Sequence, residues 1–165
     1  MNSRSDHRGA HEVENALGRL EQACRERGLP VTVQRRAVLE ALAPREDHPS
    51  AEDLFEAVSQ RVPGISRTTV YRVLETLVEL ELASRISHPG GGARFELRRG
   101  RHHHLHCIGC GSVKDFTSPA LEAVKLPHLP AYGFKVDDWS MHVTGLCADC
   151  RVRSRRTRKS GIPSS

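Results

Sequence analysis

The first part of the chain repeats apolar side chains every three or four residues, which is the period of an amphipathic helix. One such stripe runs through residues 11–27 and stops at Gly28, a residue type that commonly ends helices. A second stripe begins after Thr32, a good helix N-cap, and continues to Leu42 before Pro44 closes it. The pattern therefore predicts two successive helices.

Two further helices follow, and each starts at a serine. Ser50, with Asp53 three residues later, predicts a capping box that opens a short helix. Ser66 predicts the start of a longer helix after the break at residues 63–64. The apolar stripe of this longer helix consists of Val70, Val73, Leu74, Leu77 and Leu80.

The pattern then changes to that of a hairpin. Residues 83–86 and 94–97 favour two strands joined by a turn at residues 89–92, which are Pro-Gly-Gly-Gly. Short helices that end in a hairpin have the order of a winged helix-turn-helix, in which the last long helix lies in the major groove of DNA.

In that interpretation, residues 66–72 face the DNA. Arg67 and Arg72 can meet phosphates or guanine edges, and Thr68, Thr69 or Tyr71 can meet a thymine methyl group. The alternative is a helical bundle whose polar face meets only water, because the charge of this face is mixed.

Cysteines mark the second half of the chain, where short strands are predicted up to Cys107 and at residues 113–116, 134–136 and 140–146. Two Cys-x-x-Cys pairs, at residues 107–110 and 147–150, can supply the four thiolates that tetrahedral Zn²⁺ prefers. Such an ion contributes on the order of 10 kcal/mol to folding, which would compensate for a small core. Disulfides are the less favoured alternative, because a fifth cysteine is left over. A redox pair is also less favoured, because thioredoxin-like motifs occur singly.

A run of histidines precedes the first cysteine pair. On a strand, His102 and His104 lie on one face and His103 on the other. With Glu96 and Asp115 nearby in sequence, the first two would make a mixed nitrogen and oxygen site, which suits Fe²⁺, Mn²⁺, Co²⁺, Ni²⁺ or Zn²⁺. An exposed His-rich run that picks up metal incidentally is the alternative.

Positive charge is concentrated at one end. The net charge is +5, but residues 151–165 hold six of the 25 basic side chains and no acid, so the remainder carries 19 basic and 20 acidic side chains. We expect this basic tail to be disordered.

The sequence shows no signal peptide and no apolar segment long enough to span a bilayer, so we expect a cytoplasmic protein without membrane contact.

Five motifs occur together in a specific order. They are residues 32–36 (Thr-Val-Gln-Arg-Arg), 48–54 (His-Pro-Ser-Ala-Glu-Asp-Leu), 66–72 (Ser-Arg-Thr-Thr-Val-Tyr-Arg), the histidine and cysteine run at 102–111, and 147–150 (Cys-Ala-Asp-Cys). With these motifs the chain resembles the ferric uptake regulator (Fur) family of metal-sensing bacterial repressors from about Leu29 to Cys150.

The resemblance implies an α+β fold with two domains of different function. A winged helix-turn-helix DNA-binding domain would span residues 1–98, a small α/β dimerisation domain residues 99–150, and the basic tail residues 151–165. Structural zinc would be bound by Cys107, Cys110, Cys147 and Cys150. A regulatory metal would be bound by His48, Glu96, His102, His104 and Asp115. DNA would be contacted by Arg35, Ser66, Arg67, Thr68, Thr69, Tyr71 and Arg72.

The resemblance further implies a homodimeric repressor of metal-homeostasis genes on an AT-rich palindromic operator, with one Zn²⁺ and one Fe²⁺ or Mn²⁺ per chain. Glu96 favours the iron-responsive type. The alternative is a peroxide sensor, although these tend to have Asp at that position; their bound Fe²⁺ oxidises ligand histidines, whose counterparts would be His48 and His102. Zinc-responsive members usually have a cysteine near this position, so a zinc or nickel regulator is less favoured.

The sequence also departs from the family pattern. Trp139 and Arg101 stand where many members have histidines of an auxiliary metal site, so we do not expect that site, although His103, Glu122 or His142 can bind metal in another way.

Two prolines, Pro127 and Pro130, interrupt what is usually a continuous helix after Phe116, so this helix should be shorter.

A zinc enzyme is not expected, since the four-cysteine set leaves no open coordination position and no His-Glu-x-x-His motif occurs. A zinc-stabilised interaction module that does not bind DNA is the remaining competitor.

Overall fold

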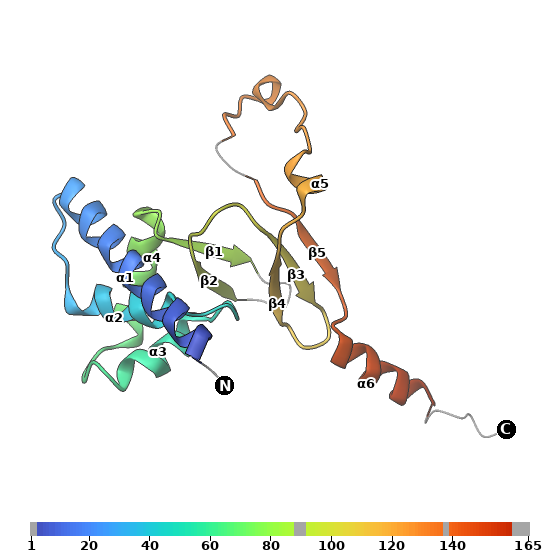
Figure 1. Cartoon of the computed structure of the whole chain (residues 1–165), viewed down its shortest axis with the longest axis horizontal. Helices are drawn as coiled ribbons and strands as arrows, with labels where there is room; N and C mark the ends of the chain where they lie inside the picture. Colours follow the sequence, from blue (N-terminus) through green and yellow to red (C-terminus); the bar gives the residue numbers. More distant parts are fainter. Residues whose placement is uncertain (1–2, 88–91, 137–138, 160–165) are drawn as a thin grey trace. The chain divides into compact units, whose positions relative to one another are not determined.

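The computed structural model describes residues 3–87, 92–136 and 139–159, and the chain divides into two compact units, Met1–Arg98 and Arg99–Ser165 (Figure 1). The first unit contains four helices and a two-stranded hairpin among its described residues. The second contains a three-stranded sheet with short helical segments and a terminal helix. The fold is therefore α+β, as the sequence predicts.

The helices of the first unit are α1 (Ser3–Glu26), α2 (Val33–Leu42), α3 (Ala51–Ser59) and α4 (Arg67–Glu79). The predicted N-caps are confirmed: Thr32 Oγ1 accepts from the Arg35 N–H, and Ser50 and Asp53 form a capping box. Ser66 caps α4 by accepting from the Thr69 N–H at 3.1 Å. The first helix begins eight residues earlier than the periodicity predicted.

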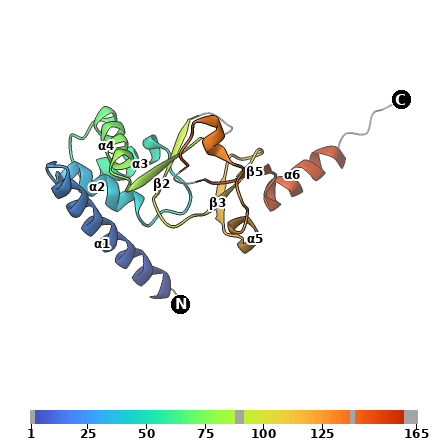
Figure 2. The same cartoon turned by 90° about the horizontal axis from the view of Figure 1, so that it is seen from above.

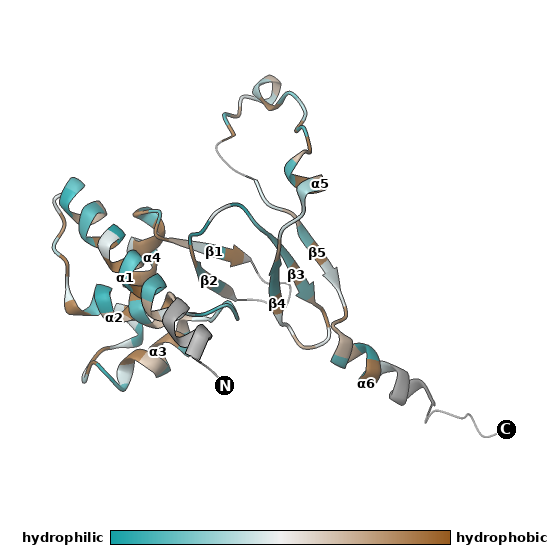
Figure 3. Ribbon diagram, viewed as in Figure 1, coloured by the Kyte–Doolittle hydropathy of each residue, from teal (hydrophilic) through white to brown (hydrophobic). Residues whose placement is uncertain are grey.

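Leucines from the predicted stripes form one core in the first unit. The side chains of Leu20, Leu39, Leu54, Leu74 and Leu77 are fully buried and come from all four helices. Helix α1 packs on α2, and α2, α3 and α4 pack on one another (Figure 2). Apolar and polar stretches alternate along these helices in Figure 3, and burial of the apolar side chains stabilises the packing of the helices.

A wing completes the first unit, as predicted. Strand β1 (Ala83–Ser87) pairs antiparallel with β2 (Ala93–Leu97), and the predicted turn lies partly outside the described residues. Strand β2 also reaches the loop before α3, because the Phe95 N–H donates to the Pro49 carbonyl at 2.9 Å and Ser50 forms a bridge with Arg94. This loop is therefore fixed to the wing.

The second unit is organised around β3 (His103–Cys107). It pairs antiparallel with β4 (Val113–Phe116) on one side and parallel with β5 (His142–Gly145) on the other. The strand predicted at residues 134–136 was wrong: these residues are irregular, since the chain enters this segment from the positive-φ residue Gly133 and finds no partner strand among the described residues.

The connection from β4 to β5 is long and contains only short helical segments. Helix α5 (Pro119–Glu122) is one turn, and a 3₁₀ segment, η1, spans Leu129–Tyr132. Two prolines lie between the end of α5 and the end of η1, which agrees with the predicted shortening of this helix.

The basic tail was predicted to be disordered, and this was wrong as far as Lys159. Helix α6 (Ala148–Lys159) starts at the second cysteine pair and contains all the arginines of the tail (Figure 2). Alanine, arginine and lysine are good helix formers, and the cysteine pair fixes the first turn, which removes the cost of nucleation. Among the described residues, no helix combines the length and the apolar character that crossing a membrane requires.

Candidate functional site

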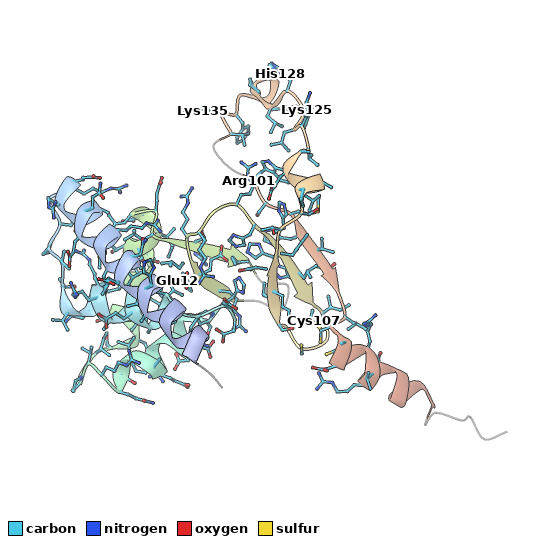
Figure 4. The ribbon with its side chains drawn as sticks, viewed as in Figure 1. Glu12, Arg101, Cys107, Lys125, His128 and Lys135 are labelled. Carbon is cyan, nitrogen blue, oxygen red and sulfur yellow. The ribbon has the colours of Figure 1, made fainter. Side chains whose placement is uncertain are left out.

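The four predicted cysteines come together in the second unit. Cys107 ends β3, Cys110 follows in a tight turn, Cys147 precedes α6 and Cys150 lies in its first turn. Their sulfur atoms all lie within 4.8 Å of one another, and none is in a disulfide. Figure 4 shows Cys107 at the end of its strand, facing the start of α6.

The spacing of the sulfur atoms fits a tetrahedral zinc ion. With Zn–S bonds of about 2.3 Å, tetrahedral geometry requires sulfur atoms about 3.8 Å apart. The Cys110 and Cys147 sulfur atoms are 3.8 Å apart. A Cβ added at Gly109 would lie 2.9 Å from the Cys150 sulfur, so glycine lets the turn approach the cluster. The geometry of the four sulfur atoms therefore fits Zn²⁺ in a site of the closed, structural kind.

Local hydrogen bonds favour the thiolate at part of this cluster. The Cys147 N–H donates to the Cys107 sulfur at 3.2 Å and, with other backbone donors, lowers the pKa of Cys107 to about 6. A hydrogen bond with the Ser112 hydroxyl likewise lowers the pKa of Cys110.

At Cys150, the guanidinium of Arg153 donates at 2.9 Å and lowers the pKa, but burial and the neighbouring thiols outweigh it and raise the value to about 11. Four ionised sulfur atoms this close would repel one another, so ionisation of the whole cluster would need a bound cation.

A histidine and a carboxylate meet in the first unit. His48 and Glu96 are both buried, and His48 Nε2 lies 3.0 Å from Glu96 Oε2. His48 has a φ of 52°, a left-handed conformation that costs a non-glycine residue about 1–3 kcal/mol. The contacts of its loop with β2 hold this strained residue, and backbone strain of this kind is common at ligand-binding sites.

A second group of donors lies on β3 and β4 of the second unit and on the residue just before β3. The Nε2 atoms of His102 and His104 lie 3.9 and 3.7 Å from Asp115 Oδ1. The Nδ1 atom of His102 is 2.9 Å from the Gly100 carbonyl, which can only accept a hydrogen bond. This contact places the proton of His102 on Nδ1 and leaves Nε2 as a metal ligand.

His103 lies on the opposite face of β3 and has structural contacts. It is buried, its Nδ1 accepts from the Met141 N–H at 3.2 Å, and its ring contacts Phe116 and Trp139. The Arg101 guanidinium in turn lies over the Trp139 ring, 5.5 Å from its centroid. Arg101 and Trp139 therefore stack on each other at the two positions where many members of the Fur family have histidines of an auxiliary metal site.

The predicted DNA-contacting residues follow one surface of the first unit. Thr68, Tyr71 and Arg72 are exposed on α4, and the Tyr71 side chain has an exposed fraction of 49%. Ser66 and Thr69 are hydrogen-bonded to each other in the cap, so they position the helix.

Two arginines of this surface are held by neighbouring groups. Arg67 bonds Glu52 at 2.8 Å and lies over the Phe55 ring, and Arg35 donates to the Pro30 carbonyl. These contacts restrict the positions of the two arginine side chains.

The residue missed by the sequence analysis is His106, and His142 was named there as a metal ligand without a partner. His106 continues the alternation of His102 and His104 and is buried on the same face of β3. That period of two was visible in the sequence and could have included it. The pairing of β3 with β5, which brings in His142, was not.

Comparison with known proteins agrees with this architecture. The chain matches the model of the ferric uptake regulator family over residues 26–144. It is 33% identical to the peroxide operon regulator of Bacillus subtilis (strain 168), over 86% of this chain and 94% of that protein.

Two solved structures are similar in fold. The Helicobacter pylori ferric uptake regulator, described with three functional metal binding sites, gives a TM-score of 0.72 at 26% identity, covering 84% of this chain and 93% of that one. The Pseudomonas aeruginosa ferric uptake regulator with manganese gives 0.64 at 30% identity, covering 78% and 97%.

Proposed function

The chain belongs to the ferric uptake regulator family of metal-responsive transcriptional regulators, and we propose that it is a dimeric repressor with Fe²⁺ as its corepressor. The observation that supports this best is the division of nitrogen and oxygen donors between the two units. His48 and Glu96 come from the DNA-binding unit, and His102, His104 and Asp115 from the other.

The chemistry of these donors suits the proposed ion. Three imidazoles and two carboxylates form a harder set of ligands than the four thiolates. Fe²⁺ or Mn²⁺ would therefore prefer the nitrogen and oxygen ligands, and Zn²⁺ the four thiolates. We propose that all five ligands bind one ion. Because the ligands come from both units, the full binding free energy is available in only one relative orientation of the units, and this orientation would fit the operator. Without the ion, other orientations compete and DNA binding weakens.

The DNA contacts would come from α4. Tyr71 can place its ring against a thymine methyl group, and Arg72 can bind a guanine edge or a phosphate. In a symmetric dimer two such helices read a palindrome, and an AT-rich operator is proposed from the family resemblance.

Exposed apolar side chains on the second unit support the proposed dimer. Leu105, Ile108, Val143 and Leu146 have exposed fractions between 39% and 67% and lie on or beside β3 and β5. Contiguous apolar surface of this kind usually marks an interface. A second copy of the chain is therefore proposed to cover this face.

A peroxide sensor is the second candidate. The B. subtilis relative, 33% identical to this chain, is named a peroxide operon regulator. One observation is against a peroxide sensor: the carboxylate beside His48 belongs to Glu96, whereas the peroxide sensors of this family tend to have Asp at that position. The two candidate functions use the same metal ligands. They differ in whether the ligand histidines are oxidised when the Fe²⁺ protein meets peroxide.

Selection from duplexes of randomised sequence tests DNA binding and finds the operator in one experiment. The zinc-loaded full chain is incubated with these duplexes without oxygen, in the presence or absence of Mn²⁺. Enrichment of an AT-rich palindrome only with Mn²⁺ is expected. Failure to enrich any sequence in either condition would support an interaction module without DNA binding.

The signal is then tested on the selected duplex. Fe²⁺-loaded protein is exposed to hydrogen peroxide, and the peptides that contain His48 and His102 are examined by mass spectrometry. For an iron-responsive repressor, we expect fresh Fe²⁺ to restore binding without addition of oxygen to either peptide. Addition of one oxygen atom with permanent loss of binding would identify a peroxide sensor.

A further inference from the structure

Three histidines meet on one face of the sheet in the second unit. His104 and His106 are two residues apart on β3, so their side chains lie on the same face. The parallel pairing of β3 and β5 places His142 opposite His104. The ring centroids of His104 and His142 are 5.0 Å apart, and those of His106 and His142 are 5.1 Å apart. We name this group the three-histidine cluster.

The nitrogen atoms of the cluster converge. One ring nitrogen from each of the three lies within 4.8 Å of the others, and His106 Nε2 is 3.0 Å from His142 Nδ1. With metal–nitrogen bonds of about 2.1 Å, tetrahedral geometry places two ligand nitrogens about 3.4 Å apart. A small opening of the His106–His142 contact therefore makes room for an ion.

Two histidines of the cluster are buried and one is exposed, so an ion bound there could exchange with solvent. His104 and His106 are buried, with exposed fractions of 4% and 3%, and are held by the central strand. His142 is exposed on β5, and its Nε2 lies 3.3 Å from the Ser140 hydroxyl. The exposed side gives an ion a route in, and Ser140 can orient the ring of His142.

We propose that the three-histidine cluster is an additional, exchangeable metal site that takes a late first-row divalent cation, Zn²⁺ foremost. Three imidazoles without a carboxylate or thiolate favour Co²⁺, Ni²⁺, Cu²⁺ or Zn²⁺ over Mn²⁺ and Fe²⁺. Three protein ligands leave one tetrahedral position for water, unlike the closed four-cysteine site.

The shared member, His104, gives the site a consequence. This part rests on the proposed function, in which His104 also binds the regulatory ion. An ion in the three-histidine cluster takes His104 away from that set, so the two sites compete. Excess Zn²⁺ would then weaken Mn²⁺-dependent DNA binding, whereas the binding of Zn²⁺ itself to the cluster can be measured without DNA.

Cobalt provides a direct test because Co²⁺ bound in a tetrahedral or five-coordinate site gives visible absorption bands. The variant His102→Ala/Asp115→Ala removes two regulatory ligands and leaves the three-histidine cluster intact. With zinc retained in the four-cysteine site, we expect it to bind one Co²⁺ per chain, and added Zn²⁺ to displace this ion. Adding His142→Gln should weaken Co²⁺ binding by about tenfold or more, since loss of a direct ligand costs at least as much as loss of an outer partner.

The matched control is His128→Gln in the same background. His128 is exposed and lies at the tip of the connection between α5 and β5, away from the sheet (Figure 4). It should leave Co²⁺ binding unchanged. The proposal fails if the double variant binds no Co²⁺ or if His142→Gln has no effect on binding.

A second measurement covers the case in which a variant does not fold. In the wild-type chain, the side-chain nitrogen resonances of His106 and His142 are followed by NMR while Zn²⁺ is added. Shifts of both resonances at one equivalent support the site. Shifts confined to His102 and His104 would overturn the proposed site while leaving the proposed regulatory function in place.

Discussion

His48 and Glu96 are separated by 48 positions in the sequence, yet their side chains lie 3.0 Å apart in the first unit. Strand β2 brings them together, because the Pro49 carbonyl accepts from the Phe95 N–H and the Arg94 guanidinium lies 3.5 Å from the His48 carbonyl. The loop that carries His48 and the strand that carries Glu96 therefore form one preorganised pair of donors.

Replacing Glu96 tests the role of this pair. We expect Glu96→Ala to raise the Mn²⁺ concentration needed for DNA binding by about tenfold or more, because an oxygen ligand is lost. Zinc content should not change, since the cysteines are untouched. Glu14→Ala, which removes an exposed carboxylate on α1, is the control. Equal Mn²⁺ dependence of the two variants, measured by fluorescence anisotropy, would remove Glu96 from the regulatory set.

The four-cysteine site is expected to stabilise the second unit. Cys107→Ser should abolish zinc retention and unfold this unit, because zinc binding contributes on the order of 10 kcal/mol to folding in small domains. Zinc content and the thermal transition measure this effect. Cys24→Ser is the control, since Cys24 is buried in the core of the first unit. It should lower stability but keep the zinc; zinc retained by Cys107→Ser would contradict the assignment.

Tyr71 is expected to contribute to DNA affinity without affecting the fold. Its side chain is half exposed on α4, so Tyr71→Ala should reduce operator affinity by about tenfold, equivalent to about 1.4 kcal/mol, and leave metal content and dimerisation unchanged. The matched control is Tyr132→Ala, the only other tyrosine, which is exposed on η1. Loss of the dimer in the Tyr71 variant would show a structural role instead.

Asp53 should make the stability of the first unit depend on pH. Donation from the Ser50 hydroxyl and backbone N–H, at 2.7 and 2.8 Å, lowers the pKa of Asp53 below its usual 3.8. A depressed carboxyl pKa stabilises the fold fully above the unfolded value and loses this contribution as pH falls through the folded value. Asp53→Asn should therefore lower the free energy of unfolding near pH 7 by about 0.5 kcal/mol, the low end for a helix-capping residue, because the Asp53 side chain is 43% exposed to solvent.

The difference in unfolding free energy between this variant and the wild type should narrow below about pH 4, as the wild-type carboxyl protonates. Denaturant unfolding followed by helical circular dichroism at several pH values measures it. Glu56→Gln, exposed on the same helix, is the control and should show no such narrowing. A difference that stays constant with pH would contradict a role for the Asp53 charge.

The sequence by itself determined the local structure and the kinds of ligand. Helix stripes and caps depend on side chains three or four residues apart, so Thr32, Ser50 and Ser66 marked their helices correctly. The paired cysteines needed no tertiary information to indicate zinc, because each pair can grip an ion within one turn. The alternation of histidines likewise showed which of them share a face of a strand.

Only the tertiary structure decided which distant segments meet. The predicted strand at 134–136 failed because strand formation needs a partner, which the described residues do not supply there. The basic tail became helical because Cys150 fixes its first turn. His142 joined His104 and His106 through the parallel register of β3 and β5. A parallel pair such as β3 and β5 has no short turn between its strands, so its pairing is set by the long connection and not by a local pattern of residues.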